Sequence, residues 1–259
     1  MDQNELRKKL SQLPLGEIRY FASVGSTNDE ALAWAANNAK DMSLVIADEQ
    51  TMGRGRLDRK WYTPRDTAIA LSLILRPTLK ERAYLSRIVG LAALAMVDTF
   101  RALGLSPQIK WPNDILLNGR KVAGILIELV WSGDEVDCLV IGIGINVEKG
   151  AVPSTDILGF PATSLEHALG YAPDRIVILH SLLTNIISLR PHLGSNSFME
   201  AWERSLAYYG RQVRVEMSGE QNVTGRIIGL DSDGSLRLRD EHGKTMSVRF
   251  GDVRLRLST

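Results

Sequence analysis

The sequence predicts an α/β (α+β) protein, built as a mixed sheet covered by helices and followed by a small C-terminal β-barrel. Up to residue 209, strands that are apolar on both faces alternate with segments of helical periodicity, as in a sheet buried under helices. After Gly210 the apolar period changes to two, in short strands separated by turn residues. Over about fifty residues this pattern is typical of a barrel of SH3-like size. We therefore expect two domains, at residues 1–209 and 210–259.

The first strand is expected at 17–23, where apolar and polar side chains alternate. A helix should begin directly after it, because Ser26 with Asp29, and Thr27 with Glu30, have the spacing of a capping box. The local interpretation of Ser26 and Thr27 is therefore a helix cap. A ligand contact is compatible with this interpretation, since the first turn of a helix presents free N–H donors.

Long apolar runs predict the centre of the core. Strands are expected at 43–47 and 67–75, where most side chains are apolar. Residues 81–103 keep helical periodicity for more than five turns, and Gly104 is well placed to end that helix.

A meander of strands is expected next. Residues 108–117 and 121–131 flank Asn118-Gly119, the strongest short signal for a hairpin. Gly133-Asp134 marks another turn, and 137–147 continues the sheet.

Two helices should precede the barrel. Residues 174–190 have one apolar face. Residues 197–209 begin with Ser197 and Glu200 at capping-box spacing, and Gly210 is the expected stop of that helix.

Composition restricts the classes of function. With 259 residues the chain can bury a core without disulfides or a structural metal. Its net charge of +1 gives no global field that would attract DNA or an anionic membrane. Cys138 is the only cysteine, so it forms no intramolecular disulfide, and we expect it to pack in the core. Residues 1–12 lack an apolar signal-peptide core, and no apolar run looks long enough to span a bilayer. We expect a cytoplasmic protein.

The loop at 53–61 carries the first sign of chemistry. Its sequence is Gly53-Arg54-Gly55-Arg56-Leu57-Asp58-Arg59-Lys60-Trp61. Glycine lets backbone N–H groups approach a ligand closely, and arginine offers planar, permanently charged donors to carboxylate and phosphate. The loop is a candidate cradle for an anion beside a flat ring, as in a nucleotide.

Three later segments carry unusual polar residues or glycines: Lys110-to-Asp114 at a strand bend, Lys121-to-Glu128, and Ile141-to-Val147. Three glycines lie within the last two segments: Gly124, Gly142 and Gly144. Glycine inside a strand often marks a place where a ligand lies against the backbone. With Lys121 and Asp114 at its rim, such a sheet suits a flat apolar ligand that ends in an anion.

Together with Ser26-Thr27-Asn28, these four segments make the chain resemble a biotin protein ligase over nearly its whole length. The five segments in this order are specific, although each alone is modest. The resemblance implies the α/β core shared by biotin ligases, lipoate ligases and class II tRNA synthetases, with a C-terminal SH3-like domain. Relatives that double as repressors carry an N-terminal helix-turn-helix domain. About twenty residues precede Ser26 here, so we expect the monofunctional form and no DNA binding.

The resemblance also implies the reaction and its reactants. In this family the carboxylate of biotin attacks the α-phosphate of ATP, pyrophosphate leaves, and biotinoyl-5′-AMP forms. A lysine of a biotin carboxyl carrier domain, as in acetyl-CoA carboxylase, then attacks the activated carbonyl. Biotin, ATP and Mg²⁺ are the expected ligands, no membrane partner is expected, and a homodimer stays open.

Site residues follow from the family motifs. Lys121, Arg56 and Asp114 are implied as catalytic, with Asp114 orienting the site or holding Mg²⁺. The implied biotin-binding residues are Ser26, Thr27, Asn28, Gln50, Arg54, Gly55, Arg56, Lys121, Gly124, Gly142 and Gly144. The implied ATP-binding residues are Arg54, Arg59, Trp61, Asn113, Lys121 and Asn146. For Trp61 a role in the core is equally open.

One departure and two alternatives remain. Asp58 stands where the family loop usually has glycine, and we expect looser retention of the adenylate, which Asp58→Gly should reverse. A lipoate or octanoate ligase on the same fold is the nearest alternative, although Gln50 and the arginine loop favour biotin. A nucleic-acid-binding protein that uses this loop is the alternative of another class, and the near-neutral charge argues against it.

Overall fold

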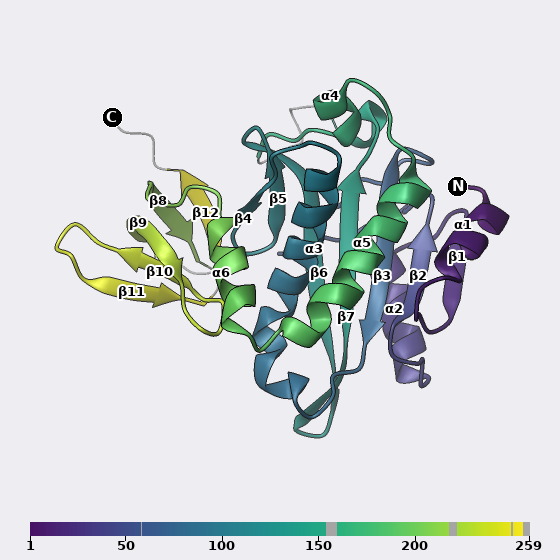
Figure 1. Cartoon of the computed structure of the whole chain (residues 1–259), viewed down its shortest axis with the longest axis horizontal. Helices are drawn as coiled ribbons and strands as arrows, with labels where there is room; N and C mark the ends of the chain where they lie inside the picture. Colours follow the sequence, from purple (N-terminus) through teal and green to yellow (C-terminus); the bar gives the residue numbers. More distant parts are fainter. Residues whose placement is uncertain (58, 154–159, 218–221, 250, 256–259) are drawn as a thin grey trace.

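A seven-stranded mixed sheet forms the larger part of the molecule (Figure 1). The computed structural model describes residues 1–57, 59–153, 160–217, 222–249 and 251–255. In sheet order the strands are β1 (Ile18–Phe21), β2 (Ser43–Ala47), β3 (Ala68–Leu75), β7 (Glu135–Asn146), β6 (Arg120–Ser132), β5 (Asp114–Leu117) and β4 (Gln108–Lys110). Strands β1 and β2 are parallel, whereas the other neighbouring pairs are antiparallel. The expected mixed sheet is confirmed.

Helices cover both faces of this sheet (Figure 1). Helices α3 (Ile88–Ala102) and α5 (Arg175–Leu189) pack on one face, and α2 (Thr27–Ala36) packs on the other. Alternate side chains of β3 serve the two faces, since Leu73 belongs to the main core cluster and Ile74 to the smaller cluster under α2. The short helices α1 (Gln3–Leu10) and α4 (Leu165–Leu169) lie at the periphery.

The turns of the meander follow the sequence in one place and depart from it in another. Asn118 and Gly119 have φ values of 49° and 74°, the pair of positive angles that a two-residue hairpin turn requires, so that prediction is confirmed. The single strand expected at 108–117 is wrong. Lys110 pairs with Asp114 across antiparallel β4 and β5, so the residues between them form a turn with a cis Trp111–Pro112 bond.

Two predicted helices need correction. Residues 81–87 form a 3-10 helix (Glu81–Arg87), and the α-helix begins only at Ile88. Its end at Gly104 is confirmed, because Gly104 has φ 80° and the Leu105 N–H donates to the Phe100 carbonyl across the final turn.

Helix α6 (Asn196–Arg204) begins and ends earlier than the sequence suggested. Its cap is Ser195, whose hydroxyl accepts a hydrogen bond from Phe198 N–H, so the capping box proposed at Ser197 is wrong. Gly210 lies beyond the helix and is not its stop.

The C-terminal part is a five-stranded antiparallel sheet of order β11-β10-β9-β8-β12. Its strands are β8 (Gln212–Glu216), β9 (Val223–Leu230), β10 (Leu236–Arg239), β11 (Thr245–Val248) and β12 (Asp252–Leu255). Buried Trp202 of α6 packs against Gly90 of α3 and Gly234 of the C-terminal part, and the Trp111 indole N–H donates to the Gly234 carbonyl at 3.0 Å. These contacts hold the two sheets together, and the domain boundary at 210 stays a prediction.

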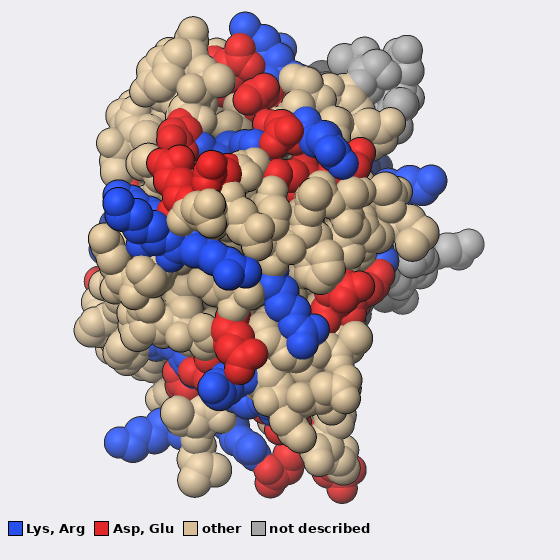
Figure 2. Space-filling view, turned by 90° about the vertical axis from the view of Figure 1, so that its right-hand side faces the viewer, with Lys and Arg blue, Asp and Glu red and all other residues tan. Residues whose placement is uncertain are grey.

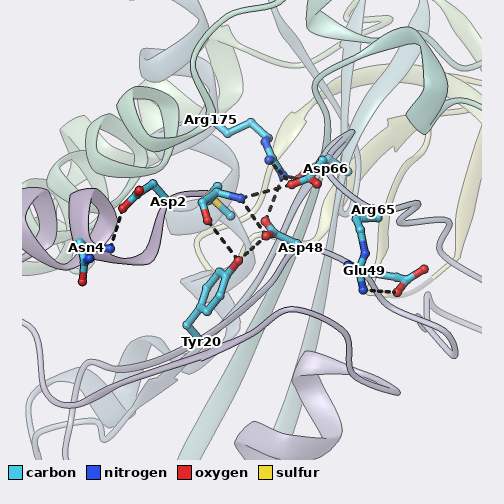
Figure 3. A network of polar contacts seen from close by, with 10 residues as sticks. Asp2, Asn4, Tyr20, Asp48, Glu49, Arg65, Asp66 and Arg175 are labelled. Carbon is cyan, nitrogen blue, oxygen red and sulfur yellow. Dashed lines mark hydrogen bonds and ion pairs between the residues drawn. The ribbon is translucent and has the colours of Figure 1, made fainter.

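A polar network ties β1 and the segment after β2 to α5 (Figure 3). The Arg175 guanidinium contacts Asp48 at 3.2 Å and Asp66 at 2.6 Å. The Tyr20 hydroxyl donates to Asp48, and the N-terminal ammonium group of Met1 lies 2.7 Å from the same carboxylate. Burial, followed by the hydrogen bond to Asp48, raises the pKa of Tyr20 to about 12.

Surface charge and apolar length bear on the partners of the chain. On the face seen in Figure 2, positive and negative side chains are interspersed, as expected from a net charge of +1. The expectation that no segment is long and apolar enough to span a bilayer needs correction, since residues 81–102 pass that test. However, 67% of the 18-residue apolar window within this segment is buried in the protein, as in a central core helix.

Candidate active site

A cavity of about 520 Å³ opens on the sheet face that α2 covers in part. It is bounded by the first turn of α2, by strands β6 and β7, by the loop at 53–61 and by β12 of the C-terminal sheet. Every site residue predicted from the sequence lines it. The sequence motifs, far apart along the chain, therefore converge on one cavity, while the role of each residue stays a prediction.

One end of the cavity is polar and uncharged. The Gln50 amide oxygen accepts hydrogen bonds from Thr27 N–H at 2.8 Å and from the Thr27 hydroxyl at 3.0 Å. Gln50 thus satisfies the first turn of α2, where the side chain of Ser26, at the N-cap position, makes no capping hydrogen bond. The capping-box interpretation of Ser26 is wrong for this reason, and Ser26 faces the cavity as a buried hydroxyl. No local pattern predicts a cap supplied by Gln50, which lies 23 residues after Thr27 in the chain.

The strand glycines form the floor of the cavity, and side chains of the protein lie against them. A Cβ atom on Gly142 would stand 2.2 Å from Asn28 Oδ1, and one on Gly144 would stand 2.3 Å from the Trp61 indole. Trp61 also approaches Gly124. Because Gly142 and Gly144 have no Cβ atom, Asn28 can pack against the sheet at the first position and Trp61 at the second. The Trp61 indole N–H is buried and has no hydrogen-bond partner among the described residues.

A chain of hydrogen bonds runs from this floor to the arginine loop. The Asn28 amide donates to Glu128 at 2.7 Å, and the Arg54 guanidinium contacts the same carboxylate at 2.8 Å and Asp29 at 2.6 Å. Burial works to lower the pKa of Arg54, but the hydrogen bond and charge of Glu128, followed by Asp29, raise it. The buried Ser72 hydroxyl lies 2.5 Å from Asn28 Oδ1. In this structure, Arg54 is held by carboxylates at the edge of the cavity.

Charged groups meet in the middle of the cavity. Lys121 Nζ lies 2.6 Å from Asp114 Oδ1 and 5.3 Å from the centre of the Trp61 ring. Arg56 donates to the Asn113 amide oxygen at 3.2 Å. The Asn113 amide also donates to the Ile125 carbonyl. Lys121 therefore pairs with Asp114, and Arg56 contacts Asn113, the residue that precedes Asp114.

The far wall comes from residues that the sequence analysis did not assign. Asp252 of β12 accepts a hydrogen bond from Arg59 across the boundary between the two sheets. Burial works to raise the pKa of Asp252, but the hydrogen bond to Arg59 and the charges of Lys110 and Arg56 lower it. Arg254, Lys110 and Phe160 also line the cavity.

Few protein groups in the cavity could bind a metal ion. No group of three or more His, Cys, Asp or Glu side chains suited to a metal occurs among the residues that the structure describes. The two oxygens of Asp114 are directed at the ammonium groups of Lys121 and Lys110. The residues that the structure describes therefore offer no protein cage for Mg²⁺, and a metal ion would enter together with the phosphates of a nucleotide.

Comparison with known proteins identifies relatives of both parts of the chain. Residues 20–146 match the Biotin/lipoate A/B protein ligase family, and residues 208–256 match the Biotin protein ligase C terminal domain. The biotin–[acetyl-CoA-carboxylase] ligase of Mycobacterium tuberculosis is 36% identical over 267 residues, which cover 98% of this chain and 95% of the relative. The bifunctional ligase/repressor BirA of Bacillus subtilis is 36% identical over 249 residues, which cover 94% of this chain and 76% of the relative.

A solved structure is similar over nearly the whole fold. The biotin protein ligase from Aquifex aeolicus in complex with biotin and ATP superimposes with a TM-score of 0.79 and 30% sequence identity. The match covers 93% of this chain and 99% of that chain.

Proposed function

The chain belongs to the biotin protein ligase family, and on that premise we propose the part that its residues take in the reaction. It is a biotin–[acetyl-CoA-carboxylase] ligase that works through biotinyl-5′-AMP. A lipoate or octanoate ligase, the alternative that the sequence left open, has less support, because the relatives from Mycobacterium tuberculosis and Paracoccus denitrificans are named biotin–[acetyl-CoA-carboxylase] ligases and the similar Aquifex aeolicus structure holds biotin and ATP.

The position of Lys121 carries the proposal. Its ammonium group lines the same cavity as Gln50 at the uncharged end and Arg56 at the cationic end, and it lies 2.6 Å from Asp114 Oδ1. The uncharged end suits the ureido ring of biotin, whose polar groups must be satisfied when buried. The cationic end suits the phosphates of ATP. Lys121 would then stand where the carboxylate of biotin meets the α-phosphate.

The first step joins two anions. A carboxylate oxygen of biotin forms a bond to the α-phosphorus, the bond from that phosphorus to the bridging oxygen breaks, and its electron pair leaves with pyrophosphate. Preorganised cations lower the barrier by stabilising charge that develops on the phosphate oxygens. We assign this role to Lys121 and to Arg56. In the second step the acceptor lysine attacks the carbonyl and AMP leaves, and Lys121 again faces the departing phosphate.

The remaining predicted residues shape the site. Trp61 packs against Gly144 and Gly124 and would lie along the ligand, while Asn28 packs against Gly142 and donates a hydrogen bond to Glu128. Magnesium would enter the site as part of the substrate MgATP. The role of Asp114 as a direct metal ligand stays a prediction, as does the effect of Asp58, which lies outside the described residues.

The acceptor and the location follow from the same premise. We propose that the acceptor is the biotin carboxyl carrier domain of acetyl-CoA carboxylase, and that the enzyme acts in the cytoplasm. The absence of DNA binding and the formation of a homodimer stay predictions.

A transfer assay tests the proposal. Purified protein is incubated with MgATP, a biotin carboxyl carrier domain and either biotin or lipoate, and the carrier is probed for the attached acid. We expect ATP-dependent labelling with biotin, lowered at least about 100-fold by Lys121→Ala. Lys40→Ala, at an exposed lysine paired with Glu17, is the matched control. Labelling with lipoate alone, or equal labelling by the two lysine variants, would overturn the proposal.

A further inference from the structure

Lys110 is a buried lysine that the proposed roles leave unused. It ends β4, its side chain is 5% exposed, and it lines the cavity. An ammonium group has three N–H donors. The described residues supply one hydrogen-bond acceptor, Asp114 Oδ2, at the long distance of 3.4 Å, and the ring of Phe160 lies 4.9 Å away. Two donors of Lys110 are therefore available to a group in the cavity.

The carboxylate of Asp114 is shared unequally between two lysines. Its other oxygen lies 2.6 Å from Lys121, so Lys121 is the better partner. Burying an ammonium group is costly unless that group is paired and fully hydrogen-bonded. Lys110 is buried and shares the Asp114 carboxylate with Lys121. Its positive charge is therefore available to an additional anion in the cavity.

The surroundings of Lys110 show what kind of anion fits. Arg56 and Arg59 of the loop line the same cavity, while Asp252 is the carboxylate on that side and is bound by Arg59. Of the residues that line this cavity, seven are Lys or Arg and two, Asp114 and Asp252, are carboxylates. This excess suits an anion with several charges, which a single carboxylate group does not provide.

We propose that Lys110 binds the β- and γ-phosphates of ATP and stabilises the pyrophosphate that leaves in the first step. The inference rests on the proposed function. When the bond between the α-phosphorus and the bridging oxygen breaks, the electron pair and the new negative charge stay on pyrophosphate. Lys110 donates hydrogen bonds to that charge, and no proton transfer is required. Lys121 acts at the α-phosphate, and Lys110 acts at the leaving group.

This division of labour separates the two half-reactions. Biotinyl-5′-AMP has lost the β- and γ-phosphates, so its reaction with the carrier lysine no longer involves a group that Lys110 binds. A lysine that only kept Asp114 in place would affect both half-reactions, because Asp114 fixes Lys121. The ratio of the two rates therefore distinguishes a phosphate contact from a structural one.

The test measures both half-reactions of Lys110→Met. ATP–pyrophosphate exchange reports the first, and transfer from supplied biotinyl-5′-AMP to a carrier domain reports the second. We expect exchange to fall about 100-fold or more, as for loss of one preorganised donor. Transfer should stay within about twofold of the wild-type rate, as estimated from the absence of the bound group in that step. Inhibition of the first step by added pyrophosphate should weaken, and Lys110→Arg should restore part of the exchange.

The results distinguish a failure of the role proposed for Lys110 from a failure of the proposed ligase function. Lys40→Met removes a lysine with a similar single carboxylate partner, Glu17 at 3.5 Å, in an exposed position, and should leave both half-reactions intact. Equal loss of exchange and transfer in Lys110→Met, or unchanged exchange and pyrophosphate inhibition, would overturn the role of Lys110. If wild-type protein itself shows neither half-reaction with biotin, the proposed function fails instead. If the methionine variant does not fold, the two half-reactions are compared in Lys110→Arg instead, after thermal denaturation has shown that this variant is folded.

Discussion

Replacing Gly142 by alanine tests whether glycine is needed there to seat a side chain of the protein. The added methyl group would stand 2.2 Å from Asn28 Oδ1, 2.8 Å from Cγ and 2.9 Å from Nδ2, so the whole amide has to move. Moving it breaks the hydrogen bond from Asn28 to Glu128 and the contact with Ser72. Arg54 then loses the fixed position of its carboxylate partner.

The size of the effect follows from these contacts. Overpacking a well-packed site costs about 1–3 kcal/mol. Loss of a hydrogen bond to a charged acceptor costs about 1.5–3 kcal/mol. Because the two effects overlap, we expect Gly142→Ala to lower the free energy of unfolding by about 3 kcal/mol. At about 2–4 °C per kcal/mol for a chain of this size, Tm should fall by about 6–12 °C.

A double-mutant cycle assigns the cause. Thermal denaturation is compared for Gly142→Ala, Asn28→Ala and the double variant, together with the KM for biotin. If the methyl group collides with Asn28, adding it to Asn28→Ala should cost much less, with a coupling of about 2 kcal/mol. Additive losses, or a Tm of Gly142→Ala within about 1 °C of the wild type, would show that the added methyl group does not displace Asn28.

Two further predictions concern charged contacts outside the floor. Because the pKa of Tyr20 is raised to about 12, from about 10 in an unfolded chain, its contribution to stability is complete below pH 10 and is lost between pH 10 and 12. Tyr20→Phe should therefore flatten the loss of Tm over that range, and an unchanged slope would speak against the contact with Asp48. Asp252→Asn should lower Tm at pH 7 by about 2–4 °C, because the contact to half-exposed Arg59 contributes only about 1 kcal/mol. The pKa of Asp252 is lowered, so this difference should vanish as the pH falls through that lowered value, and a difference that persists in acid would contradict the assignment.

The parts of the fold that could be predicted from the sequence depend on neighbouring residues. Asn118-Gly119 defined a hairpin because both positions need positive φ, and Gly104 ended a helix for a related reason. The glycines of β6 and β7 indicated a close approach to the sheet, although the residues that approach them in the structure are Asn28 and Trp61.

The parts that could not be predicted depend on contacts between distant segments. Arg59 and Asp252 are 193 positions apart, and no local pattern links them. The sequence predicts that Asp114 and Lys121 are both catalytic. Lys110 reaches the same carboxylate only because of the turn between β4 and β5. The sequence predicts a bend within one strand at this turn, because proline interrupts a strand ladder in a bend and in a turn alike.

The most direct test of the central claim is a comparison of both half-reactions in Lys121→Ala. The claim is that one cavity performs both steps and that Lys121 faces the reacting phosphate in each. We expect the formation of biotinyl-5′-AMP and its transfer to a carrier domain each to fall at least about 100-fold, with the fold of the variant intact. Transfer from supplied biotinyl-5′-AMP at the wild-type rate would contradict the claim and would restrict Lys121 to the first step.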